Sequence, residues 1–303
     1  MSCLPKSVRI VEVGPRDGLQ NEPVHVSTKD KVELVSLLGK AGLKNIEAAA
    51  FVSPKWVPKM ADSAEVMAQI ERLPGVIYPV LTPNKKGLDG AIAAQAQEIA
   101  VFGAASEAFS KANTNSTLDE VLNRAIPLVE QARAHGMKAR GYISCCLGCP
   151  YEGATDPAKV LDVAIQLREM GCFEIVVSDT IGTGTPRQSA ALIELLLPHI
   201  PVDEIAVHFH DTYGQALANV YACMELGVSV VDSSIAGLGG CPYAKGASGN
   251  LATEDLLYML DGLGIESGVS MDRILDASAF ISGVLGRPPA SKAGQALLAK
   301  RKG

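Results

Sequence analysis

The residues most able to do chemistry fall in three short segments. His208-Phe209-His210-Asp211 ends an apolar run. Residues two apart in a β-strand point to the same side, so both imidazoles should face one way, an arrangement that favours a metal site. Arg16 and Asp17 occupy a second segment, a turn after the first apolar run. Taken alone, that pair could equally be a surface ion pair.

The third segment is a loop rich in glycine, with five glycines between positions 236 and 250. This composition predicts a mobile loop that folds tightly over a ligand, although a long flexible connection is the simpler alternative. Cys241 lies in the middle of the loop. A cysteine there could be a nucleophile or an acid–base group, or an incidental thiol.

The elements that must position these segments alternate along the chain. Apolar runs predict eight strands, at Val8–Val13, Asn45–Ala49, Val76–Leu81, Glu98–Phe102, Lys138–Ser144, Glu174–Ser178, Ile205–Phe209 and Val228–Ser233. Helical patterns lie between them, for example at Thr28–Ala41, Ala61–Leu73, Leu118–His135, Pro157–Met170, Pro186–Leu197 and Gln215–Leu226. This alternation predicts βαβ units and a parallel sheet.

Eight such repeats favour a closed (β/α)8 TIM barrel of class α/β over an open doubly wound sheet. The open sheet would be favoured by a G-x-G-x-x-G dinucleotide fingerprint, which residues 13–18 do not fit. We expect residues 1–303 to form one catalytic barrel domain, with residues from about 265 onward as a short helical C-terminal extension.

Barrel closure predicts where the chemistry converges. Active sites of such barrels lie at the carboxyl ends of the strands, and the eighth strand neighbours both the seventh and the first. Asp17, His208, His210 and Asn250 could therefore meet at one point. Nitrogen and oxygen ligands without thiolate favour Mg²⁺ or Mn²⁺, with Zn²⁺ or Co²⁺ as alternatives.

Composition narrows the classes of partner. The net charge of −6 argues against nucleic acid, and no apolar run is long enough for a membrane helix. The cluster Cys145, Cys146 and Cys149 lacks the second pair that a structural zinc site needs. A strand pattern begins almost at the first residue, and the seven cysteines show no disulfide framework. We therefore expect no leader peptide and a cytoplasmic protein.

Four segments of the chain resemble the 3-hydroxy-3-methylglutaryl-CoA lyases, and the resemblance runs from about residue 8 to residue 285. They are residues 13–21, residues 51–58, residues 208–212 and the glycine-rich loop that ends at Asn250. The first segment and the His-x-His pair are also typical of other metal-dependent aldolases and acyl-CoA condensing synthases. The Gly-Gly-Cys-Pro sequence of the loop and Ser-Pro-Lys-Trp-Val-Pro at 53–58 are more specific.

The resemblance implies a role for each candidate residue. It implies a divalent cation, Mg²⁺ or Mn²⁺ in our expectation, on Asp17, His208, His210 and Asn250. It also implies an acyl-CoA substrate, bound with the help of Arg16, Gln20 and Tyr142, and a catalytic set made of Arg16, Asp17, Glu47, Asp179 and Cys241. Arg16 would stabilise enolate charge, and Cys241 would be the catalytic thiol.

The implied reaction is cleavage of 3-hydroxy-3-methylglutaryl-CoA to acetyl-CoA and acetoacetate through a thioester enolate. The alternatives are a related acyl-CoA lyase, a condensing synthase or 4-hydroxy-2-oxoacid aldolase of the same barrel group, and a barrel that binds CoA or metal without catalysis. We expect a homodimer. The candidates for contact with the CoA phosphates are Lys55, Lys59, Lys85 and Lys111.

Overall fold

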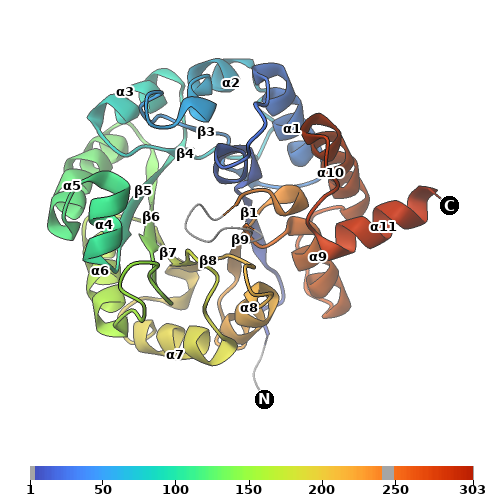
Figure 1. The fold of residues 1–303 in the computed structure, drawn as a ribbon. Coiled ribbons are helices and arrows are strands. Elements are labelled where there is room, and N and C mark those ends of the chain that lie inside the picture. The colour runs from blue at the N-terminus through green and yellow to red at the C-terminus, as the bar shows by residue number, and fades with distance from the viewer. Residues whose placement is uncertain (1–3, 241–248, 303) are drawn as a thin grey trace.

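A computed structural model describes residues 4–240 and 249–302 of the chain. Its parallel strands form a ring that is surrounded by helices, as Figure 1 shows along the axis of the ring. The predicted (β/α)8 barrel is therefore confirmed. The strands are β1 (Arg9–Glu12), β2 (Asn45–Ile46), β3 (Ala49–Ala50), β4 (Val80–Leu81), β5 (Glu98–Ala104), β6 (Lys138–Ser144), β7 (Glu174–Asp179), β8 (Ile205–Phe209) and β9 (Val230–Ser233).

The barrel closes through the segment 45–50, which contains both β2 and β3. The strand order runs from β2 through β1 and then from β9 down to β3. β2 pairs with β1 and β3 pairs with β4. Between them the Glu47 amide donates to the Glu12 carbonyl at 2.8 Å, and the Ala48 amide donates to the Pro79 carbonyl at 3.1 Å. One predicted strand thus joins both ends of the sheet, in two short parts.

Helices follow the strands and cover the outside of the barrel (Figure 1). They are α1 (Thr28–Lys40), α2 (Ser63–Gln69), α3 (Lys85–Ala93), α4 (Glu107–Thr114), α5 (Leu118–Ala134), α6 (Pro157–Glu169), α7 (Pro186–Leu196), α8 (Ala216–Met224), α9 (Thr253–Gly262), α10 (Met271–Leu285) and α11 (Lys292–Lys302). The Ser27 side chain caps α1 by accepting from the Asp30 amide. No helix within residues 4–240 and 249–302 has the length and apolar character needed to cross a bilayer.

Two apolar layers hold the barrel together. The larger cluster joins the outward side chains of the strands to the helices. A smaller cluster occupies alternate strand positions on the inner side, with Val11, Ala100, Tyr142, Val176, Ala206 and Val230 among its members. The same alternation turns Arg140 and Glu174 into the barrel interior, where both are buried. The floor of the site is therefore polar as well as apolar.

Candidate metal centre and active site

Asp17, His208 and His210 converge at the carboxyl ends of β1 and β8. Asp17 lies in a short π-helix, Gly14–Gly18, that directly follows β1. One ligand atom from each of the three residues lies within 4.8 Å of the others. His208 Nε2 and Asp17 Oδ2 are 4.0 Å apart, which is too long for a hydrogen bond but suits two ligands of one ion.

Asn250 completes the set of four predicted ligands. Its backbone pairs with that of His210, and its Nδ2 donates to Asp17 Oδ2 at 2.8 Å. Asn250 Oδ1 and His210 Nδ1 are buried and have no hydrogen-bond partner among the described residues. Buried polar atoms without a protein partner are costly, so these two atoms are suited to bind a cation. Two imidazoles, a carboxylate and an amide oxygen form a mixed nitrogen–oxygen set that can hold a divalent cation.

Arg16 is held beside this centre by two carboxylates. Its Nη1 bonds to Asp17 Oδ1 and its Nη2 to Glu47 Oε2, each at 2.8 Å. Glu47 is buried, and burial raises its pKa although Arg16 opposes that effect. Burial would also raise the pKa of Asp17, but Arg16 and the two imidazoles outweigh it and hold that pKa below its ordinary value. The guanidinium is therefore fixed next to an ionised Asp17.

Glu12 holds the turn that carries Arg16 and Asp17 in place through hydrogen bonds. This residue was not predicted from the sequence. Glu12 Oε1 accepts from the amides of Gly14 and Ile235, both at 2.8 Å, and its Oε2 accepts from Thr253 Oγ1 at 2.6 Å. A Cβ at Gly14 would lie 2.6 Å from Glu12 Oε1, so only glycine fits this turn. Burial raises the pKa of Glu12 to about 7.

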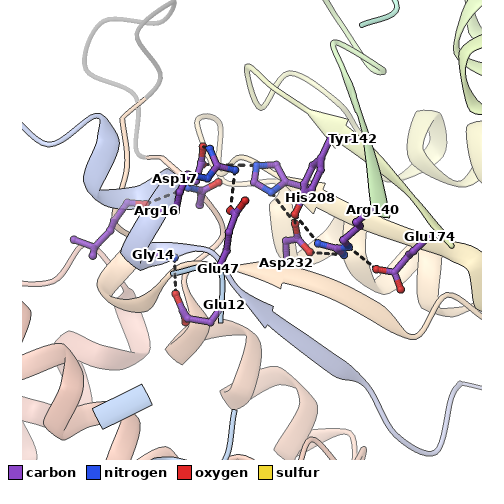
Figure 2. Close-up of polar contacts among 12 residues, drawn as sticks. Glu12, Gly14, Arg16, Asp17, Glu47, Arg140, Tyr142, Glu174, His208 and Asp232 are labelled. Atoms are coloured by element: carbon purple, nitrogen blue, oxygen red, sulfur yellow. Dashed lines mark hydrogen bonds and ion pairs between the residues drawn. The ribbon is translucent and has the colours of Figure 1, made fainter. Parts of the chain in front are cut away.

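His208 contacts a second network of buried polar side chains inside the barrel (Figure 2). Its Nδ1 lies 3.2 Å from Asp232 Oδ2. Asp232 is ion-paired with Arg140 at 2.8 Å, and Arg140 also pairs with Glu174. Asp232 is the charged residue of the apolar run Val228–Ser233. It was not predicted as a site residue, because its partners lie in other strands.

The two histidines sit in different electrostatic surroundings. Burial disfavours the charged form of His208, but Asp232 outweighs burial and raises the pKa of His208 above its ordinary value. Burial and the neighbouring His208 lower the pKa of His210 to about 4. Burial acts against the charge of Asp232 too, yet Arg140 and His208 lower its pKa to about 2. His210 is thus ready to ligate a cation at neutral pH.

The remaining candidates are placed less directly at the centre. The Asp179 carboxylate accepts from the amides of Thr183 and Gly184, at 3.2 and 2.8 Å, and burial raises its pKa to about 6. The Tyr142 hydroxyl lies in the network below His208. Gln20 follows the π-helix, and its Oε1 is buried without a partner among the described residues. Cys241 lies outside the described residues.

Three of the candidate lysines for CoA have contacts of their own. Lys59 Nζ donates to the Pro23 carbonyl at 2.8 Å, and Lys85 Nζ to Asp89 Oδ1 at 3.2 Å. Lys55 Nζ lies 5.9 Å from the centre of the Trp56 ring, and that tryptophan is 80% exposed. The role of these lysines and of Lys111 stays a prediction.

The chain is similar to known proteins over nearly its full length. Residues 7–281 match the family described as HMGL-like. A mitochondrial hydroxymethylglutaryl-CoA lyase of Bos taurus is 58% identical, over 98% of this chain and 91% of that protein. A protein of Pseudomonas aeruginosa is 55% identical over 98% of this chain and 99% of its own length; its name is 3-hydroxy-3-isohexenylglutaryl-CoA/hydroxy-methylglutaryl-CoA lyase. A crystal structure of a hydroxymethylglutaryl-CoA lyase from P. aeruginosa superimposes with a TM-score of 0.97 at 55% identity, covering 99% of this chain and 100% of that one.

Proposed function

The chain belongs to the HMGL-like family, and we propose that it cleaves 3-hydroxy-3-methylglutaryl-CoA to acetyl-CoA and acetoacetate at the Asp17–His208–His210 centre. The observation that carries the proposal is the position of Arg16, fixed beside three converging candidate cation ligands at the carboxyl ends of the barrel strands. Cleavage of this thioester by the proposed route uses both parts, one to polarise the tertiary alcohol and one to stabilise the enolate.

We propose Mg²⁺ or Mn²⁺ as the cation, held by Asp17, His208, His210 and Asn250. When bound, it would supply Lewis-acid polarisation of the substrate's hydroxyl and carboxylate oxygens. Asp17 is suited to this task because it stays ionised, and His210 because it stays neutral. The unpartnered Asn250 Oδ1 supplies the fourth donor.

Arg16 acts on the part of the substrate that becomes acetyl-CoA. A base takes the proton of the 3-hydroxyl, and the electron pair left on that oxygen forms the carbonyl of acetoacetate. The bond between C2 and C3 breaks at the same time, and its electron pair passes to the thioester as an enolate. The Arg16 guanidinium stabilises that developing negative charge, and Glu47 keeps the guanidinium in place through its ion pair. Protonation of the enolate carbon then gives acetyl-CoA, and we assign that proton to the thiol of Cys241.

The decisive experiment measures acetoacetate and acetyl-CoA released from the thioester by the purified protein. We expect turnover with Mg²⁺ or Mn²⁺, none with excess chelator, and recovery when the cation is restored. Cys241→Ala should lose most turnover, whereas Cys223→Ala, which alters a buried free thiol in α8, should keep it. A folded wild type that binds the cation and releases no product would overturn the reaction.

A second substrate is favoured by the name of the P. aeruginosa relative, which includes the 3-isohexenyl analogue. The two substrates differ only in the alkyl group at C3, and the oxygens that the centre would hold are the same in both. Parallel measurement of kcat/KM for both thioesters decides between them. A ratio near one would assign a dual activity to this chain, and a ratio above about 100 would assign a single substrate.

We also propose that the chain works in the cytoplasm. The five cysteines within the described residues, Cys145, Cys146, Cys149, Cys172 and Cys223, are all free and buried. Reduced thiols are typical of that compartment. Fractionation of the source cells with an antibody against the chain tests the proposal, and recovery in an oxidising compartment would contradict it.

A further inference from the structure

Asp232 faces His208 across two neighbouring strands. The parallel register of β8 and β9 places the two residues opposite one another. Asp232 Oδ2 lies 3.2 Å from His208 Nδ1, while His208 Nε2 points to Asp17 on the other side of the ring (Figure 2). Asp232 is 1% exposed, so water cannot easily replace this contact.

The hydrogens around Asp232 can be assigned from the chemistry of its partners. Arg140 can only donate, so the Tyr142 hydroxyl accepts from Arg140 Nη1 at 2.6 Å and directs its own hydrogen to Asp232 Oδ2 at 2.9 Å. Arg140 Nη2 lies 2.8 Å from Asp232 Oδ1. An ionised carboxylate held in this way accepts only, so a hydrogen bond with His208 requires the hydrogen to be on His208 Nδ1.

A proton on Nδ1 has a consequence for the opposite ring nitrogen. In the neutral ring, Nε2 then carries the lone pair and directs it toward Asp17. His210 lacks such a constraint, because its Nδ1 has no hydrogen-bond partner among the described residues. The network therefore fixes the tautomer of one histidine of the pair.

We propose that Asp232 is a positioning residue that holds the neutral His208 in the tautomer protonated at Nδ1, so that Nε2 is free to ligate the cation. This inference rests on the proposed metal site. Partners of this kind raise metal affinity without touching the metal, and their loss costs about 10–100-fold in affinity or activity. The competing explanation is that Asp232 only balances the charge of Arg140.

A matched pair of variants separates these explanations. Asp232→Asn keeps the shape but offers an amide hydrogen to Nδ1, which favours the tautomer protonated at Nε2. Glu174→Gln makes the same change on the other side of Arg140, in a carboxylate that is equally buried and does not touch His208. Both variants remove one buried charge from the network, so their thermal stabilities should fall together.

The test is calorimetric titration of each protein with Mn²⁺ in the absence of substrate. We expect the dissociation constant to rise about 10–100-fold in Asp232→Asn and to stay within about threefold of wild type in Glu174→Gln. An unchanged constant in a folded Asp232→Asn, or equal losses in both variants, would overturn the role of Asp232. A wild type that binds no Mn²⁺ would instead overturn the metal site.

A measurement on the wild type covers the case in which Asp232→Asn does not fold. Nitrogen-15 NMR of the cation-free protein at alkaline pH, where imidazole is neutral, reports which ring nitrogen carries the proton. The His208 signals are identified by their loss in His208→Gln. We expect protonated Nδ1 and bare Nε2, and the reverse pattern contradicts the inference whatever the variants do.

Discussion

Arg16 differs from the surface arginines because both carboxylates that hold it belong to the site. Asp17 and Glu47 bind its two terminal nitrogens, and the residue is only 7% exposed. Its side chain therefore needs no reorganisation when enolate charge develops nearby. Such preorganised donors contribute more in the transition state than in substrate binding.

Arg16→Gln should consequently lower kcat by about 10²–10³-fold with little change in KM. Steady-state kinetics with the thioester substrate measure both constants. Arg168→Gln is the matched control, because Arg168 pairs with Glu204 on the outside of the barrel and is 42% exposed there. A KM that rises while kcat stays constant would show instead that Arg16 binds substrate and transition state equally.

The pKa shifts of the two histidines predict how cation binding depends on pH. In the cation-free protein His208 has a raised pKa, whereas that of His210 is lowered to about 4. Near pH 6, His208 is therefore the ligand that must lose a proton, and binding of Mn²⁺ should release about one proton per ion. Titrations in buffers of different ionisation enthalpy count the protons. Release of two would mean that His210 is also charged in the free protein.

At the scale of elements, Glu12 joins the end of β1 to the first residue of η4 (Ile235–Gly237) and to that of α9. Its pKa rises from 4.5 unfolded to about 7 folded, because burial penalises the carboxylate. Between these pH values the unfolded chain releases the proton and the folded chain keeps it. The contribution of Glu12 to stability therefore falls by roughly 3 kcal/mol as pH rises from 4.5 to 7, and it is constant above that.

Glu12→Gln should remove this dependence while keeping the acceptor for the Gly14 and Ile235 amides. Compared with wild type, the variant should become relatively more stable as pH rises across that window. Urea unfolding at a series of pH values gives both curves, and the titration of other groups cancels in their difference. Parallel curves would mean that Glu12 has an ordinary pKa in the folded chain.

The accuracy of the sequence predictions varied between elements for physical reasons. The strands at 138–144 and 205–209 were predicted with the limits that they have in the structure, although the first contains Lys138, Arg140 and Gly141, which are not typical strand residues. Val76–Leu81 was too long: only Val80–Leu81 is a strand, and Pro79 just before it lacks an amide hydrogen. α3 contains Gly87 and Gly90, which lower helix propensity, yet both glycines allow close packing against Phe51.

The residues of the candidate site also differed in how well the sequence predicted them. Asp17 and the two histidines could be found because strand ends and spacing mark them. Asp232 was missed, because its partners His208 and Tyr142 are 24 and 90 residues away and only the register of the barrel brings them together. A charged residue within an apolar strand is the signal that was present and overlooked.

At the scale of the whole molecule, closure of the barrel assembles the centre and the C-terminal helices complete the closure. Asn250 and Asp17 are 233 residues apart and share a hydrogen bond. On the outside, α10 lies between α9 and α1 (Figure 1). Its inner face buries Ile274, Leu275 and Ile281, so it completes the helical layer next to β1. The last helix, α11, packs on α9 and α10 from outside.

Two truncated chains should show which of the C-terminal helices is needed for folding. A chain that ends at Ser291 loses α11, whose leucines Leu297 and Leu298 are only half-buried, but keeps the hydrogen bond from the Ala290 amide to the Ala236 carbonyl at 2.8 Å. It should fold, melt a few degrees lower and retain most of its lyase activity.

A chain that ends at Ser270 loses α10 and exposes the core beside α1. This exposure lowers the free energy of unfolding by about 2–3 kcal/mol for each large buried side chain. It should not fold. Circular dichroism melting and the acetoacetate assay compare both with the full chain, and a folded, active chain ending at Ser270 would show that α10 lies outside the barrel's core.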